Sequence, residues 1–590
     1  MNVDELLAQR AVELEDDRPK ILVSGRRMRD ISADSVRLLE QENETSMRFF
    51  QFGDVLAEVV EDEERGILTR HFTHVLLKGT LDRLANFVAI DKDGNEKPTR
   101  PPTDVVADLL ALPTVSLPPL KGVLETPVYS PTGELAIQRG YDRRTGYYIN
   151  LTPKLSIPDV DREPNGAAIS RARQLISDEL IGDFPFATEA DTANAIGVHI
   201  TPYASPLIAG PKPLIVVESP TPGSGKDLLV DVLTSPMVPS GLARMTEAQS
   251  EDEWRKRITA KLLAAPQFIL IDNVRSALDS AALSAALTSR LWEDRVLGQS
   301  RTASIPVNCI WFVTANNPRL SVEIARRSVS IRLDSKVQRP WQRMNFKYPD
   351  LRLWARQNRG DLIWAGLTLV RAWIAKGMPA GKAIMGSYEE WAKVVGGVLD
   401  VAGVPGFLGN SERLYASAEE EMAAWGEFVA AWWTEFRDDP VGSDLLFEMA
   451  TRLKLLVDVW GGRKAHGART GFGIALSKMR DRVIGKYCIK HAGEDSHTKS
   501  PRYRLELLRG VRGLAGASTS QAWSPNGEDV PSDSEMGREK APQPPATPRS
   551  GRADSPSEEA QPDDYWYPSN NPVDSEGWDR RWRELGVGDI

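Results

Sequence analysis

Three short apolar runs follow one another along the middle of the chain, and each of them ends in polar residues. The runs cover residues 214–217, 267–271 and 307–314, and stretches with a helical period separate them at residues 245–264 and 278–292. Strands that alternate with helices in this way predict a parallel sheet with helices on both faces. Ligands of such sheets bind at the carboxyl ends of the strands, so we expect the polar residues after each run to form the functional site.

The residues after the first run have the pattern of a phosphate-binding loop. The stretch PLIVVESPTPGSGKDLL, from Pro213 to Leu229, reads as a strand, a turn and a helix. Gly223 and Gly225 allow positive φ, which lets the backbone approach an oxyanion closely, and the following helix N-terminus adds partial positive charge. The expected nucleotide-binding residues are Thr221, Pro222, Gly223, Ser224, Gly225, Lys226, Asp227 and Leu228.

The loop departs from the pattern G-x-x-x-x-G-K-[ST] at both ends. Pro220 stands at the first glycine and Asp227 at the Ser or Thr that holds Mg²⁺, so an ordinary turn is an alternative for this stretch taken alone. A carboxylate about 4 Å from a phosphate oxygen costs roughly 1 to 4 kcal/mol. The sign reverses if Asp227 is a ligand of Mg²⁺, which prefers oxygen donors. We therefore expect retained ATP binding and slower or altered hydrolysis.

The second and third runs add polar side chains at positions where a nucleotide site needs them. Asp272 follows FILI and is expected to be a second magnesium ligand, acting through water. Asn316 follows the third run, where an amide can position the attacking water near the γ-phosphate. Arg326 and Arg327 come next, and we interpret one of them as an arginine finger for a neighbouring subunit. The alternative is a pair of surface arginines.

In this order, the segments PTPGSGK, FILIDN, TSRLWEDRVLG, FVTANN and ARRSVSIRLD resemble the AAA+ ATPase module of phage and mobile-element primase-helicases, which are close to superfamily-three helicases. The similarity extends over residues 18–508. It implies that Lys226 is the Walker A lysine, Asp272 the Walker B acid and Asn316 the sensor-one amide, with Arg326 or Arg327 as the finger. It also implies ATP and Mg²⁺ as cofactors and a hexameric ring that translocates on single-stranded or forked DNA.

The resemblance leaves the general base open. The Walker B motif ends in Asp272 and Asn273, where an acid pair is expected. Glu218, at the tip of the first strand, and Glu253 are the candidates that the sequence offers.

The segment 441–510 carries an excess of basic residues in an otherwise acidic chain. Helical periods at Leu445–Val459 and Thr470–Val483, with Thr470 as the expected N-cap, precede the strand-like runs KYCIKHAG and RYRLELL. Helices followed by a two-stranded ribbon suggest a winged helix. A charge run is often only a solvated face, but this pattern favours phosphate contacts with DNA. The expected DNA-binding residues are Lys478, Arg480 and Arg482 on the second helix, and Lys486, Lys490, Lys499, Arg502 and Arg504 on the wing.

The overall composition is that of a globular protein with a net charge of −9. This charge argues against a wholesale nucleic-acid coat. Cys309 and Cys488 both lie in apolar runs, which indicates a reducing compartment, and no apolar run approaches the length of a membrane span. We therefore predict a cytoplasmic protein without a membrane partner.

Composition and patterning divide the 590 residues into five segments. They are an N-terminal α+β accessory domain at 1–160, an AAA+ P-loop ATPase core at 161–335, a helical region at 336–440, a winged-helix-like DNA-binding domain at 441–510 and a disordered acidic tail at 511–590. The predicted fold class is α/β, built around the parallel sheet of a P-loop NTPase. The tail segments DDYWYP and GWDRRWRELG carry aromatic residues that suggest a protein partner.

These observations leave three functional hypotheses. The first is an ATP-dependent DNA helicase or replication ATPase of a phage or integrated element. The second is a nucleotide-binding but hydrolysis-impaired DNA scaffold or loader, which Asp227 and Asn273 keep open. The third is a defence or remodelling ATPase that acts on a protein partner through the aromatic tail.

Overall fold

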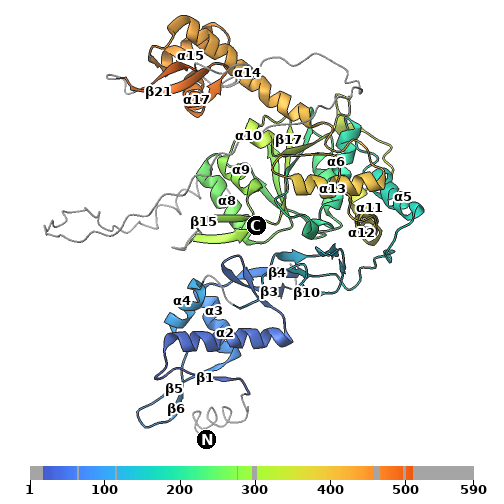
Figure 1. Ribbon diagram of the computed structural model, residues 1–590, viewed down its shortest axis with the longest axis vertical. Helices are drawn as coiled ribbons and strands as arrows, with labels where there is room; N and C mark the ends of the chain where they lie inside the picture. The colour runs from blue at the N-terminus through green and yellow to red at the C-terminus, as the bar shows by residue number, and fades with distance from the viewer. Residues whose placement is uncertain are drawn as a thin grey trace, which may run out of the picture. The chain divides into compact units, whose positions relative to one another are not determined.

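A computed structural model describes residues 17–62, 66–112, 116–275, 277–295, 302–456, 465–495 and 500–508 (Figure 1). The chain divides into two compact units, Met1–Arg512 and Gly513–Ile590. The second unit, with the predicted aromatic tail, lies outside the described residues. Among the described helices, none combines the length and the apolar character that a membrane crossing requires.

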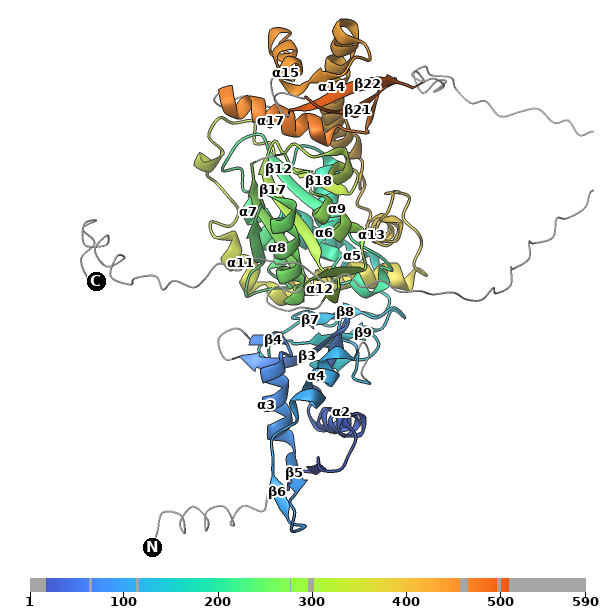
Figure 2. The ribbon, with the colours of Figure 1, turned by 90° about the vertical axis from the view of Figure 1, so that its left-hand side faces the viewer.

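A five-stranded parallel sheet has the order β13-β14-β17-β12-β18 (Figure 2). Its strands are β12 (Leu214–Ser219), β13 (Ala243–Thr246), β14 (Phe268–Val274), β17 (Ile310–Asn316) and β18 (Ser328–Arg332). The three predicted strands are confirmed as β12, β14 and β17, while β13 and β18 were not predicted. Because β17 lies between β12 and β14, the three polar strand ends meet at one edge of the sheet.

Both faces of this sheet are buried. Ile215 and Val217 belong to one hydrophobic cluster, and the alternating residues Leu214 and Val216 belong to another, as the two-residue period of a strand requires. The first face is covered by α5 (Gly166–Gln174), α6 (Glu189–Ile200), α7 (Lys226–Thr234), α12 (Arg359–Ala375) and α13 (Glu389–Ala402). The second is covered by α8 (Glu251–Leu263), α9 (Ala281–Thr288) and α10 (Val322–Ala325).

Two predicted helices are shorter than their apolar periods suggested. The helix predicted at 245–264 begins only at Glu251, because Ser250 caps it and the residues before it form β13. The helix predicted at 278–292 is α9, which Ser280 caps. Its last predicted residues instead form β15 (Leu291–Arg295), which pairs with β16 (Thr302–Pro306) in a hairpin.

The N-terminal part of the described chain mixes helices and strands around its own hydrophobic cluster, which contains Leu39, Phe49 and Leu77. Two three-stranded sheets occur here, β1-β5-β6 and β2-β3-β4. The elements are β1 (Lys20–Leu22), α2 (Met28–Thr45), β2 (Phe49–Phe52), β3 (Val55–Asp62), β4 (Gly66–His71), α3 (His74–Leu84), β5 (Asn86–Ile90), β6 (Glu96–Pro98) and α4 (Thr103–Ala111).

Short strands connect this part to the core. A three-stranded sheet has the order β10-β11-β7, and β8 pairs with β9. These strands are β7 (Gly122–Leu124), β8 (Val128–Tyr129), β9 (Leu135–Ala136), β10 (Gly140–Asp142) and β11 (Tyr147–Ile149). The pairs β8-β9 and β10-β11 are antiparallel, so residues 128–149 contain two short hairpins.

The C-terminal described part has a separate hydrophobic cluster that includes Trp425, Trp432 and Phe472. Its four-stranded sheet has the order β19-β22-β21-β20. The elements are α14 (Ser411–Phe436), β19 (Val441–Gly442), α15 (Ser443–Arg452), α17 (Ala465–Lys478), β20 (Val483–Ile484), β21 (Tyr487–Glu494) and β22 (Pro501–Leu507). The predicted strand-like runs are confirmed as β21 and β22.

The predicted helix bounds in this part were wrong. Helix α15 ends at Arg452, ahead of a turn in which Lys454 and Leu456 adopt positive φ. Helix α17 begins at Ala465, so Thr470 lies inside it and is no N-cap. The same helix ends at Lys478, before Asp481 adopts a φ of 63° and donates its N–H to the Ile489 carbonyl oxygen at 2.7 Å.

Candidate nucleotide site

The loop between β12 and α7 has the backbone that an anion cradle requires. Gly223 and Gly225 have φ of 74° and 93°, in the left-handed region that favours glycine. A Cβ at Gly223 would lie 3.1 Å from the Trp341 ring, and one at Gly225 would lie 3.4 Å from the Phe184 ring. Gly225 is the N-cap of α7, so the loop opens directly onto a helix N-terminus.

Lys226 lies in the first turn of α7 and turns back toward the strand ends. Its Nζ donates to Asn316 Oδ1 at 2.7 Å and to Ser219 Oγ at 3.0 Å, and the residue is only 9% exposed. Burial lowers the pKa of Lys226, and the neighbouring Asp227 opposes this shift. The structure thus brings Lys226 and Asn316 together, and Ser219 is a contact that the sequence did not indicate.

Asp272 lies at an irregularity in the sheet. The pairing of β14 with β17 shifts register between Ile271 and Val274, which is typical of a β-bulge that re-aims side chains. Thr314 Oγ1 donates to Asp272 Oδ1 at 3.0 Å and accepts the Asn273 N–H at 2.9 Å. One threonine on the central strand therefore fixes both residues of the predicted Walker B tip.

An arginine from β13 holds the other oxygen of this carboxylate. Arg244 donates to Asp272 Oδ2 at 3.2 Å and to Asp231 Oδ1, on α7, at 2.7 Å. Arg352, on α11 (Leu351–Gln357), donates to Asp231 Oδ2 at 2.6 Å. The sequence did not indicate Arg244, because β13, the strand that carries it, was not predicted.

The oxygen donors present fit a magnesium ion that is shared with phosphates and water. Asp227 is exposed in the first turn of α7, and Asp272 presents a half-buried carboxylate at the tip of β14. Carboxylates suit Mg²⁺, which usually takes one or two of them and keeps several waters. In the described ranges, no cluster of three or more His, Cys, Asp or Glu residues could form an all-protein cage.

The two finger candidates differ in their surroundings. Both bind the Glu323 side chain, Arg326 at 2.7 Å, and the two cations lower the pKa of that carboxyl. The Arg327 side chain is only 13% exposed and also donates to the Glu323 carbonyl oxygen, whereas the Arg326 side chain is 50% exposed. Only Arg326 of this pair is accessible to a neighbouring subunit.

The two glutamates that the sequence offered as bases are engaged elsewhere. Glu218 is buried, and its carboxylate accepts from Arg413 at 2.5 Å, Ser330 at 3.0 Å and Arg332 at 3.4 Å. Glu253 lies on α8, where it accepts from Arg257 at 2.9 Å. These contacts bury and fix the Glu218 carboxylate, so it does not fit this role.

The predicted DNA-binding residues fall into two groups. Lys478, the last residue of α17, pairs with Asp279 at 3.1 Å, and Lys490 pairs with Asp481 at 2.8 Å. Arg502 donates to the Pro440 carbonyl oxygen at 2.8 Å. Arg480 also pairs with Asp481, at 3.4 Å, while Arg482, Lys486 and Arg504 are exposed, as are Lys478 and Arg480. Arg480 and Arg482 lie in the turn after α17 and not on the helix as predicted, and Lys499 lies outside the described residues.

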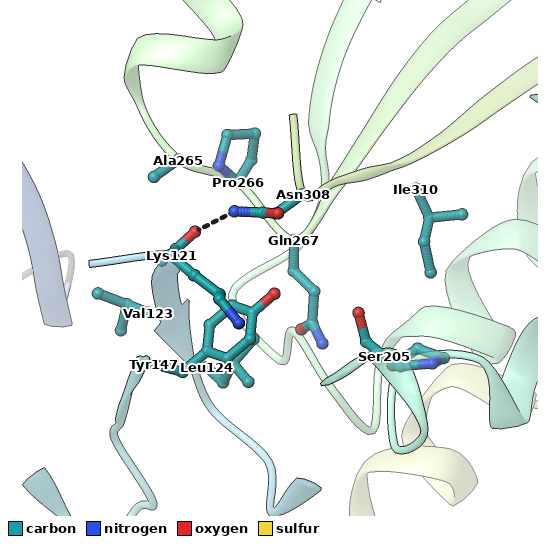
Figure 3. Close-up of a pocket in the computed structure, with 12 residues that line it drawn as sticks. Lys121, Val123, Leu124, Tyr147, Ser205, Ala265, Pro266, Gln267, Asn308 and Ile310 are labelled. Atoms are coloured by element: carbon teal, nitrogen blue, oxygen red, sulfur yellow. Dashed lines mark hydrogen bonds between the residues drawn. The ribbon is translucent and has the colours of Figure 1, made fainter. Parts of the chain in front are cut away.

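A small enclosed space lies at the opposite edge of the sheet, near the amino ends of β14 and β17 (Figure 3). Its volume is about 20 Å³, and Lys121, Tyr147, Ser205 and Gln267 line it. Asn308 donates to the Lys121 carbonyl oxygen at 3.0 Å, which the dashed line in Figure 3 marks. This space holds about one water and is too small for a triphosphate.

Comparisons with solved structures give distant likenesses. The A-form apo structure of the NrS-1 C-terminal region, residues 305–718, has 11% identity and a TM-score of 0.35, over 80% of this chain and 99% of that one. A second structure of that region has 11% identity and a TM-score of 0.31, over 78% and 96%. JCV helicase has 14% identity and a TM-score of 0.20, over 44% and 68%.

No protein-family model matches the chain, and no curated protein matches it. At these identities and scores the structural likenesses carry no argument about function. The functional proposal therefore depends on the geometry of the nucleotide site, the topology of the C-terminal part and the sequence resemblance described above.

Proposed function

We propose that this chain is an ATPase of the AAA+ type that works on DNA, as a helicase or replication ATPase that forms a ring. One observation carries the proposal. The Lys226 ammonium, at the start of α7 and behind a loop with two left-handed glycines, lies between oxygens from the ends of two neighbouring parallel strands. An amine in that position, at a helix N-terminus, is suited to the β and γ phosphates of a nucleotide.

The side chains at the strand ends then have separate roles. Lys226 exchanges its contacts to Ser219 and Asn316 for phosphate oxygens. Asn316 is freed to orient the attacking water. Asp272 and Asp227 hold Mg²⁺, which when bound neutralises negative charge on the phosphates. Arg326 of one subunit completes the site of the next, and for this reason we propose a homo-oligomer, a hexamer by the resemblance stated above.

The proposal that DNA binds the C-terminal part follows from its topology. A helix, a short strand, two helices and a hairpin follow in order, and the short β19 pairs with β22 of the hairpin. We interpret this arrangement as a winged helix with β21 and β22 as the wing. Its exposed cations, Lys478, Arg480, Arg482, Lys486 and Arg504, supply phosphate contacts that depend on salt and little on sequence.

A nucleotide-binding scaffold with impaired hydrolysis is the second candidate. Asp227 adds a negative charge at the first turn of α7, and Asn273 offers no carboxylate beside Asp272. This candidate predicts ATP binding without strand displacement.

The test measures binding of a fluorescent ATP analogue, ATP turnover with and without single-stranded DNA, and displacement of a strand from a forked duplex. We expect DNA-stimulated turnover, displacement, and a larger particle mass when nucleotide is present. Binding without turnover or displacement would select the scaffold. Absence of nucleotide binding by the full chain would overturn both candidates.

A further inference from the structure

The predicted Walker B tip carries the amide of Asn273 where a second carboxylate is expected. Asn273 follows Asp272 at the bulge, adopts a φ of 51° and donates its N–H to Thr314 Oγ1. Its amide side chain is not a base at neutral pH. If the site hydrolyses ATP, another carboxylate at the same edge has to accept the proton of the attacking water.

Glu247 is placed at that edge by the neighbouring strand. Thr246, the last residue of β13, pairs with Asp272, so Glu247 is the first residue beyond the tip. Its Oε2 accepts the Arg275 N–H at 3.1 Å. Because Val274 pairs with Ala315, the Arg275 N–H lies at the strand end beside Asn316. The Glu247 carboxylate therefore lies at the end of β14, beside the residues that follow Asp272.

The backbone that carries Glu247 is held by an arginine of α8. Arg257 donates to the carbonyl oxygens of Thr246 at 3.0 Å and Glu247 at 3.2 Å, and to Thr246 Oγ1 at 2.7 Å. Glu253 in turn accepts from Arg257 at 2.9 Å. A carboxylate on a strand end with such support keeps its position when the substrate arrives. Glu253, which the sequence offered as a base, therefore has a positioning role through Arg257.

Asp231, Asp272 and Glu218 take part in ion pairs with arginines. Arg244 and Arg352 bind Asp231, and Arg244 also binds Asp272. Glu218 accepts from Arg413. Glu247 lies at the level of Asn273, the residue that follows the Walker B acid.

We propose that Glu247 is the general base of ATP hydrolysis, supplied by the strand next to the Walker B strand in place of Asn273. The inference depends on the ATPase function proposed above. The water oxygen forms a bond to the γ-phosphorus while the bond from that phosphorus to the bridging oxygen breaks. ADP keeps the electron pair of the broken bond. The water proton passes to Glu247 and then to solvent.

The test compares Glu247→Gln with the wild-type full chain in ATP turnover and in the affinity for the fluorescent ATP analogue. Glu390→Gln, an exposed glutamate on α13, is the matched control. We expect Glu247→Gln to lower turnover by at least about a hundredfold, the range for loss of a general base, with nucleotide affinity unchanged. We expect Asn273→Glu in the Glu247→Gln background to restore part of the turnover, because it returns a carboxylate beside Asp272.

Turnover of Glu247→Gln within tenfold of wild type would overturn the assignment. A double variant without recovered turnover would also count against it, since a carboxylate at position 273 would then not replace Glu247. A wild-type chain that binds the analogue but hydrolyses no ATP removes the role of Glu247 and leaves nucleotide binding intact. A chain that binds no analogue instead removes the proposed function itself, so the two failures are distinguishable.

Discussion

The two ends of strand β12 each carry a buried lysine, and their surroundings are opposite. Lys226, beyond the carboxyl end, lies within 3.0 Å of two side-chain oxygens and follows a glycine loop. Lys212, before the amino end, donates to the Asn308 carbonyl oxygen at 3.4 Å, and burial lowers its pKa to about 8. Burial is common to both lysines, so burial alone does not identify a nucleotide-binding lysine. The side-chain oxygens that accept from Lys226, and the glycine loop before it, distinguish this lysine.

The direction of the parallel strands explains the difference. At the carboxyl edge, the chain leaves the sheet in loops that expose backbone and polar side chains to a ligand. At the amino edge, Lys121 and Tyr147 pack against the core and leave a space of about 20 Å³ (Figure 3). A second lysine there, Lys121, is exposed, although desolvation lowers the pKa of its amine. The following predictions test whether function is confined to the carboxyl edge.

The largest effect is expected at Arg326. Arg326→Ala should lower turnover of the assembled protein by about a thousandfold or more, the range for an arginine finger, while each subunit keeps its affinity for nucleotide. Arg327 is its matched control, because that side chain is mostly buried and bound to Glu323. Mixing Arg326→Ala with Lys226→Ala should restore some turnover, since each variant supplies what the other lacks. Equal turnover of Arg326→Ala and wild type would contradict a shared site.

The next effect concerns stability at the amino edge. Lys212→Met should raise the free energy of unfolding at pH 7, because the charged amine is buried in the native state. Its pKa is about 8 when folded and about 10.5 when unfolded, which corresponds to about 3 kcal/mol. The unfolded chain binds more protons between these values, so wild-type stability rises with pH there.

The advantage of Lys212→Met should therefore be largest below pH 8 and shrink as the pH approaches 10.5. Urea unfolding at pH 7 and pH 10 measures it, and nucleotide affinity should not change. A stability difference that is equal at the two pH values would show that burial of the charged Lys212 amine does not destabilise the native state.

The sequence predicted this contrast only in part. The apolar runs that end at Asp272 and Asn316 indicated the carboxyl edge, because strand ends are visible as a change from apolar to polar residues. The Arg244 contact with Asp272 was not predictable, because it depends on β13 joining the sheet beside β14. The same pairing brings Glu247 to the tip.

The sequence also could not predict in which direction the side chains at the strand ends point. Glu218 and Ser219 are neighbours at the end of β12, yet Ser219 contacts Lys226 while Glu218 accepts from Arg413 on α14. The period of two along a strand predicts that neighbours diverge, but not which of them faces the ligand. That choice depends on Arg413 of α14 and Ser330 of β18, which both donate to Glu218.

A smaller effect is expected for Lys226 itself. Lys226→Ala should weaken binding of the ATP analogue by roughly 10- to 100-fold, since a hydrogen bond to a charged group contributes about 1.5 to 3 kcal/mol. Lys212→Met is the control at the other end of the same strand. Fluorescence titration of both variants measures the contrast. Equal loss of affinity in the two variants would mean that the lysines act through stability and not through contact with phosphate.

The smallest effect is expected at Asp227, whose carboxylate adds a negative charge next to the loop. Asp227→Thr should keep the affinity for the nucleotide and raise turnover by about tenfold, which is about 1.4 kcal/mol in the barrier. A threonine hydroxyl at this position can bind Mg²⁺ without repelling the phosphates. Titration of turnover with Mg²⁺ separates two possibilities. If Asp227 is itself a magnesium ligand, the variant needs more Mg²⁺ for half-maximal turnover, whereas a carboxylate that only repels phosphate gives the opposite shift. A variant identical to wild type in both turnover and Mg²⁺ requirement would place Asp227 outside the site, although it directly follows Lys226.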